Sequence, residues 1–106
     1  MAGMETLNFA FDGGRALAPF APTLVGVVAS GNLEVLVESA SDTGCRIDID
    51  TSARGFGAIW EAVLRDFRDR HDLGGIRVSI HDMGATPAVV SLRLDQAVSA
   101  IPGATP

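Results

Sequence analysis

Apolar and polar residues alternate in several stretches of the chain. This period of two predicts β-strands, because successive side chains of a strand face opposite sides of a sheet. A further stretch, residues 24–29, is a run rich in β-branched residues, which also favours a strand. The predicted strands cover residues 6–12, 24–29, 33–38, 45–50 and 76–81. Polar residues at every second position predict that one face of the sheet is partly open to solvent.

The two strands that meet at Ser30-Gly31-Asn32 form the most distinctive pair. Small, turn-forming residues separate them, so the span 24–38 is predicted to be a β-hairpin with a two-residue loop, Gly31-Asn32. Ser30 then stands at the tip as an exposed hydroxyl on a rigid support. Such a position suits a covalent modification, and it suits equally a serine that has no role.

Two segments have the spacing of amphipathic helices. In the first, from Phe56 to Phe67, apolar residues recur every three or four positions, and opposite charges four apart, such as Glu61 and Arg65, predict a solvated outer face. The second is predicted to begin at Thr86-Pro87, with threonine as N-cap and proline at the first position. Pro102-Gly103 ends it.

The order of these elements predicts an α+β fold, a two-layer sandwich in which a mostly antiparallel sheet of about five strands has two helices on one face. A helix between strands 45–50 and 76–81 allows one parallel pair, and the strand order is not fixed by the sequence. Residues 13–22 are expected to be a loop, because glycines and prolines interrupt them. We expect a single domain over residues 4–102, with flexible ends at residues 1–3 and 103–106.

Composition narrows the classes of function. The formal net charge is -5 and lysine is absent, which argues against nucleic acid, since phosphate binding needs clustered cations. An acidic surface suits docking onto basic patches of partner proteins, and ordinary solubility explains it equally well. No apolar run is long enough to span a membrane and no signal peptide is recognisable, so a cytoplasmic protein is expected. The single cysteine, Cys45, excludes an internal disulfide and is predicted to be a buried, inert thiol.

Candidate catalytic groups are few. The two histidines, His71 and His81, lack the spacing of a metal site. A triad of Ser30, His81 and Asp82 is disfavoured, because adjacent strand residues point to opposite faces and Asp82 would not orient His81. Asp48 and Asp50 share one face of a strand, which a solvent-facing sheet edge explains better than acid–base chemistry. Catalysis by this chain alone is not expected.

Three runs of sequence resemble the acyl carrier subunit of malonate decarboxylase over nearly the whole chain. They are residues 4–9, residues 30–36 and residues 80–94. The resemblance extends more weakly to the acyl carrier subunit of citrate lyase, and the run from His81 to Pro87 favours the malonate branch. That run also reads simply as a strand-to-helix connector, with Gly84 for a positive φ.

This resemblance implies that Ser30 carries a phosphoribosyl-dephospho-CoA group through a phosphodiester, with Gly31 and Asn32 forming the tip around it. It implies that the thiol of this arm holds acetyl and malonyl groups as thioesters. The implied partners are an acetyl/malonyl transferase subunit, decarboxylase subunits and an enzyme that attaches the arm. The carrier itself would be non-catalytic, and a recombinant chain is expected to lack the arm where that enzyme is missing.

The sequence departs from the family pattern at Ala29, Asn32 and Met83, where glycine, aspartate and phenylalanine are usual. None of these changes removes the Ser30 hydroxyl. Further candidates for docking a partner or contacting the arm are Glu34, His81 and Asp82. Two alternatives remain open: a citrate lyase type carrier, and a non-catalytic interaction or regulatory domain that has lost the prosthetic group.

Overall fold

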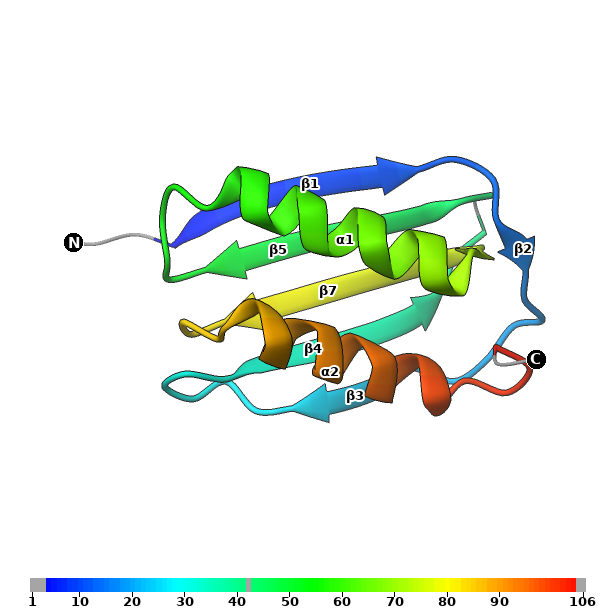
Figure 1. Cartoon of the computed structure of the whole chain (residues 1–106). Coiled ribbons are helices and arrows are strands. Elements are labelled where there is room, and N and C mark those ends of the chain that lie inside the picture. Colours follow the sequence, from blue (N-terminus) through cyan, green and yellow to red (C-terminus); the bar gives the residue numbers. More distant parts are fainter. Residues whose placement is uncertain (1–3, 42, 105–106) are drawn as a thin grey trace.

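A computed structural model describes residues 4–41 and 43–104 of the 106-residue chain (Figure 1). A five-stranded sheet carries two helices on one face, and two short strands form a second, smaller sheet. In chain order the elements are β1 (Glu5–Phe11), β2 (Arg15–Ala16), β3 (Thr23–Gly26), β4 (Leu33–Ser39), β5 (Cys45–Thr51), α1 (Gly57–His71), β6 (Leu73–Gly74), β7 (Ile76–Asp82) and α2 (Pro87–Ser99). The predicted α+β fold is confirmed.

The strands of the large sheet lie in the order β1-β5-β7-β4-β3. β5 and β7 are parallel, because the chain crosses the sheet through α1 between them, and the other neighbouring pairs are antiparallel. β7 is therefore the central strand and pairs with β4 on one side and β5 on the other. The C-terminal ends of β5 and β7 consequently lie at the same end of the molecule.

The core lies between the sheet and the helices. Alternate residues of the three central strands are buried there, including Val35, Ile47 and Val78 at 0% exposure. Leu64 of α1 and Leu94 of α2, also at 0%, cover them from the helix side. The residues between these positions lie on the opposite face of the sheet, which neither α1 nor α2 covers (Figure 1). That face is the partly open one that the sequence predicted.

Asp48 and Asp50 lie on this open face, but the expectation that they mark a sheet edge is wrong. Their strand, β5, is an inner strand between β1 and β7. Asp48 accepts a hydrogen bond from Arg77 at 3.1 Å, and Asp50 accepts one from the Thr6 hydroxyl at 2.9 Å. Their partners across neighbouring strands explain both acids.

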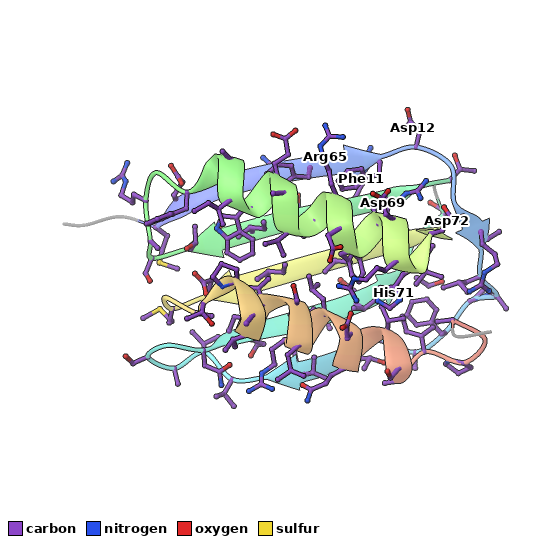
Figure 2. All side chains as sticks on the ribbon, in the orientation of Figure 1. Phe11, Asp12, Arg65, Asp69, His71 and Asp72 are labelled. Carbon is purple, nitrogen blue, oxygen red and sulfur yellow. The ribbon has the colours of Figure 1, made fainter. Side chains whose placement is uncertain are left out.

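Both helices have the predicted character. Thr86 caps α2 by accepting a hydrogen bond from the Val89 N–H at 3.3 Å. The last turn of α1 is linked to α2, because His71 Nε2 and Arg70 Nη1 lie 2.9 and 2.6 Å from Asp95 Oδ1. Figure 2 shows His71 at the end of α1, on the side that faces α2.

The segment predicted as a loop contains a short strand. β2 pairs in parallel with β6, so that Arg15 lies opposite Leu73. The Arg15 side chain also donates hydrogen bonds to the carbonyls of Gly103 and Ala104 at 2.8 and 2.5 Å, and Ala104 is 2% exposed. Of these two residues of the expected flexible end, Ala104 is buried and Gly103 is exposed, and both carbonyls are held by Arg15. The other residues of the expected ends, 1–3 and 105–106, lie outside the described part of the chain.

Candidate functional site

The connection between β3 and β4 is longer than the predicted two-residue loop. The last residue pair of the two strands is Gly26 with Glu34, so residues 27–32 form the connection. Gly26 ends the pairing because its φ of +83° turns the chain out of the strand, in a conformation that side chains other than glycine rarely adopt. Val27 and Val28, predicted as strand residues, are instead 56% and 50% exposed.

Ser30 lies at the exposed apex of this connection. The Asn32 N–H donates to the Ala29 carbonyl at 2.9 Å, which closes a four-residue turn with Ser30 and Gly31 at its centre. Gly31 has a φ of +72°, the conformation that a type II turn requires at its third position. Within residues 4–41 and 43–104, no group forms a hydrogen bond with the Ser30 hydroxyl. Its oxygen is therefore free to form a new bond.

The turn is held in place by the connector between β7 and α2. The Gly31 N–H donates to the Met83 carbonyl at 2.8 Å, and the Met83 N–H donates to the Asn32 carbonyl at 3.0 Å. These bonds continue the β4–β7 ladder beyond its last pair, Leu33 with Asp82. The two runs that the sequence singled out, around Ser30 and around Met83, are thus adjacent in space.

The side chain of Asn32 provides a second attachment. Its Oδ1 accepts hydrogen bonds from the Leu33 N–H at 2.8 Å and from Arg93 Nε of α2 at 3.2 Å. Sequence reasoning missed Arg93, because nothing local relates it to a turn 61 residues away. The backbone next to Ser30 is therefore connected both to the sheet and to a helix.

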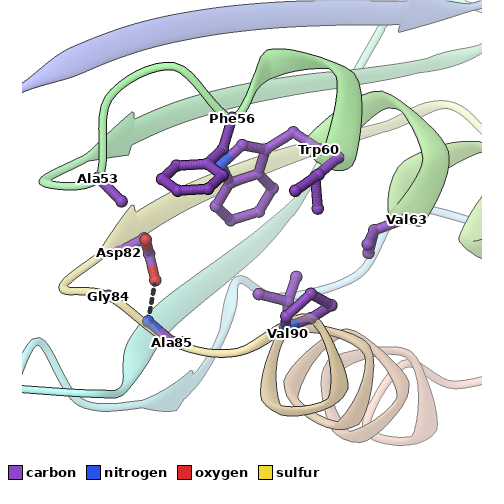
Figure 3. Close-up of a pocket in the computed structure, with 10 residues that line it drawn as sticks. Ala53, Phe56, Trp60, Val63, Asp82, Gly84, Ala85 and Val90 are labelled. Carbon is purple, nitrogen blue, oxygen red and sulfur yellow. Dashed lines mark hydrogen bonds between the residues drawn. The ribbon is translucent and has the colours of Figure 1, made fainter.

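Asp82 supports the connector from inside the fold. It is 2% exposed, and one of its oxygens accepts a hydrogen bond from the Thr51 hydroxyl at 2.8 Å. The other accepts a hydrogen bond from the Ala85 N–H at 2.9 Å (Figure 3). The predicted role of Asp82 in contacting a partner or an arm stays a prediction, and its low exposure leaves little of the side chain available for such a contact. Its neighbour His81 is exposed, in agreement with the argument against a triad.

Glu34 and His81, the other docking candidates, lie together on the open face of the sheet near the tip. His81 Nδ1 is 3.8 Å from Glu34 Oε1, and its Nε2 is 3.6 Å from Asp50 Oδ2. The His81 side chain is 47% exposed. The three residues form a polar row across β4, β7 and β5, and their role in docking stays a prediction.

A small apolar cavity lies on the helix side of the connector. It has a volume of about 210 Å³ and is lined mainly by residues from the first turns of both helices and from the connector (Figure 3). Phe56 and Ile59, at its rim, are each 46% exposed. The sequence assigned both to a core stripe and gave no sign of a cavity.

Cys45 is buried at 2% exposure, as predicted. Burial raises the pKa of its thiol to about 11, against a smaller opposing effect of the Arg68 charge.

In the described part of the chain, no group of three or more metal-ligating side chains comes together. No helix in the same residues has the length and apolar character needed to cross a membrane.

The structure thus shows an α+β domain with an exposed serine that has no hydrogen-bond partner among the described residues, on a turn held by backbone hydrogen bonds. Comparison with known proteins identifies the kind of domain. Residues 21–101 match the family described as malonate decarboxylase delta subunit (MdcD), and the chain belongs to this family.

Close relatives are malonate decarboxylase acyl carrier proteins, which are carriers and not catalytic subunits. The relative from Burkholderia cepacia is 66% identical over 99 residues, which cover 93% of this chain and 92% of the relative. The relative from Xanthomonas axonopodis pv. citri is 63% identical over 103 residues, with 95% and 98% covered. A chain in the crystal structure of a Pseudomonas malonate decarboxylase hetero-tetramer in complex with malonate is 40% identical. Its TM-score is 0.79, and the match covers 89% of this chain and 95% of that one.

Proposed function

We propose that this chain is the acyl carrier subunit of a malonate decarboxylase, with a phosphoribosyl-dephospho-CoA arm joined to Ser30 by a phosphodiester. The observation that carries the proposal is the exposed Ser30 hydroxyl, which has no partner among the described residues, on a fixed turn in a member of this family. The surroundings fit a bulky group, because a Cβ built at Gly31 meets no atom within 4 Å. When bound, the arm supplies a thiol that holds acetyl and malonyl groups as thioesters.

The residues of this chain contribute by holding the attachment point of the arm in a fixed place. Ser30 Oγ is the ester oxygen, and the hydrogen bonds between Gly31, Asn32 and Met83 keep this oxygen at a fixed place on a rigid scaffold. Tethering an acyl group at such a place raises its effective concentration at each partner active site. Oxyanion donors and acid–base groups then belong to the transferase and decarboxylase subunits. We place the protein in the cytoplasm, where these subunits and the attaching enzyme would meet it.

Two alternatives make different predictions. A citrate lyase type carrier would bear the same arm but would support turnover of citrate. An interaction domain that lost the arm would leave Ser30 unmodified. The retained, exposed Ser30 and the malonate decarboxylase names of the relatives favour the first proposal.

A reconstituted reaction tests the proposal. The loaded carrier is mixed with purified partner subunits, and release of carbon dioxide is measured with malonate and with citrate. We expect malonate-dependent release that Ser30→Ala abolishes, because this change removes the proposed attachment oxygen. Ser52→Ala, which removes another exposed serine at the same end of the molecule, retains activity. Turnover of malonate by the Ser30→Ala carrier would contradict the proposal.

A further inference from the structure

The cavity beside the connector has the size of a site for a small group. Its volume of about 210 Å³ exceeds the roughly 150 Å³ of an engineered apolar cavity that binds benzene. It is smaller than the about 300–1,000 Å³ of pockets that enclose drug-sized ligands. The end of an acyl arm fits this range, whereas a whole nucleotide does not.

The walls of the cavity are mainly apolar. Trp60 and Val63 come from α1, Val90 from α2 and Ala85 from the connector (Figure 3). The lining also includes Phe56 and Ile59, which are each 46% exposed. The half-exposed Phe56 and Ile59 leave apolar surface in water at the mouth of a concave site. Covering such surface with an apolar ligand is favourable.

The cavity is close to the proposed attachment point. Ser30 lies on the turn that leads into β4, and one wall of the cavity is the segment that follows β7, the neighbouring strand. Hydrogen bonds between Gly31, Asn32 and Met83 join these two segments directly. The Ser30 turn and this wall of the cavity are therefore neighbouring segments, and a flexible arm tethered to Ser30 can fold back toward the cavity.

The charge within the cavity distinguishes two kinds of acyl group. The Asp82 carboxylate contributes to the lining, and the donors that hold it are Thr51 and Ala85. Among the described residues, no arginine, lysine or histidine side chain lines the cavity. An acetyl group is neutral and enters at little electrostatic cost. A malonyl group brings a second carboxylate next to Asp82 into a mostly apolar site, which is unfavourable.

We propose that the cavity between α1, α2 and the connector holds the acetyl-thioester end of the arm and rejects the malonyl-thioester end. This inference rests on the proposed function, because it needs the arm on Ser30. The carrier then shelters its acetyl form between encounters with partners and presents its malonyl form to the decarboxylase subunits. Binding is reversible and involves no covalent step.

Trp60, the only tryptophan of the chain, reports on the cavity. The full-length carrier is loaded with acetyl or malonyl groups, and intact mass first establishes that the arm and the acyl group are present. Indole fluorescence and the Trp60 Nε1–H resonance are then compared among the unmodified, acetyl and malonyl forms. We expect a blue-shifted emission and a shifted resonance for the acetyl form only. We also expect several-fold slower hydroxylamine cleavage of the acetyl thioester than of a free acetyl thioester.

Cavity-filling variants provide the control. Ala53→Leu places a larger side chain in the cavity and is expected to abolish both the Trp60 response and the protection of the thioester. Ala85→Leu serves the same purpose if Ala53→Leu folds poorly. Ala58→Leu makes the same exchange on the exposed side of α1, outside the cavity, and retains both effects.

Three outcomes would overturn the inference. With the arm present by mass, identical Trp60 signals in the acetyl and malonyl forms would contradict it and leave the proposed function intact. A Trp60 response that appears only when a partner subunit is added would assign the cavity to that partner. Absence of the arm by mass in carrier exposed to the attaching enzyme would overturn the proposed function as well.

Discussion

Two glycines shape the hairpin tip through different constraints. Gly26 and Gly31 both have a positive φ, which glycine alone adopts without strain. A Cβ at Gly26 would lie 2.1 Å from the Leu33 carbonyl oxygen, whereas a Cβ at Gly31 meets nothing within 4 Å. The backbone conformation therefore favours glycine at both positions, and at position 26 the close Leu33 carbonyl also leaves no room for a side chain.

Replacing each glycine by alanine tests this difference. We expect Gly31→Ala to lower the free energy of unfolding by about 1–2 kcal/mol, the cost of a left-handed conformation for an L-residue. Gly26→Ala is expected to cost more, about 3 kcal/mol or above, because a backbone clash adds to the strain. Urea unfolding of both variants measures the two values. Equal losses would show that the Leu33 carbonyl does not constrain Gly26.

Cys45 yields a prediction about reactivity. With a thiol pKa of about 11, only about one thiol in a thousand is ionised at pH 8, and the group is buried as well. We expect no reaction of the folded, unmodified chain with an aromatic disulfide reagent at pH 8, and one thiol per chain after unfolding in urea. Rapid reaction of the folded chain would contradict the burial of Cys45. A thiol that reacts in the folded, loaded carrier therefore belongs to the arm.

At the scale of elements, the two helices are joined at one end by ion pairs around Asp95. Burial by itself would raise the pKa of this carboxyl group. The hydrogen bonds from His71 and Arg70 outweigh it and hold the pKa below its ordinary value of 3.8. A carboxyl group whose pKa is lowered by folding stabilises the fold above its unfolded-state pKa, and this stabilisation is lost as the pH falls through the folded-state pKa.

The variant Asp95→Asn tests this link between α1 and α2. We expect a modest loss of stability at neutral pH, because the carboxylate is 42% exposed and solvent screens it. The difference from the wild-type chain should shrink as the pH is lowered from 5 through 4 and below. Unfolding in urea at several pH values gives both curves. A difference that does not change with pH would rule out the ionised carboxylate as its source.

The elements themselves could be predicted because their signals are local. Alternation identified four of the five strands of the large sheet, a run of β-branched residues indicated the fifth, and the Thr86-Pro87 cap located the start of α2. What failed depends on contacts between distant segments. The end of β3 is set by Gly26 packing against Leu33, and the two residues of β2 are a strand only because β6 lies beside them.

Some features of the candidate site could also be predicted from local sequence, and others depend on contacts between distant segments. The exposed position of Ser30 follows from turn-forming residues around it, and its proposed role came from resemblance to a family. The contact of Arg93 with Asn32 and the cavity beside Asp82 exist only after the sheet and helices have packed. Alternation did predict that Asp82 and His81 face opposite ways. It did not show that Asp82 holds the connector from within.

At the scale of the whole molecule, one end gathers the features that bear on function. The C-terminal ends of β5 and β7, the N-terminal ends of both helices and the hairpin tip lie together there (Figure 1). Because β5 and β7 are parallel and each is followed by a helix, the fold itself brings these parts to one end. The chain after α2 packs against Arg15 at the opposite end.

The central claim is that Ser30 carries the acyl arm. The most direct test is the intact mass, with peptide mapping, of the carrier from cells that grow on malonate, compared with Ser30→Ala and Ser52→Ala. We predict an added mass equal to phosphoribosyl-dephospho-CoA, located on the peptide that contains Ser30, lost in Ser30→Ala and kept in Ser52→Ala. An unmodified Ser30 in cells that contain the attaching enzyme, or the same added mass on Ser30→Ala, would contradict the claim.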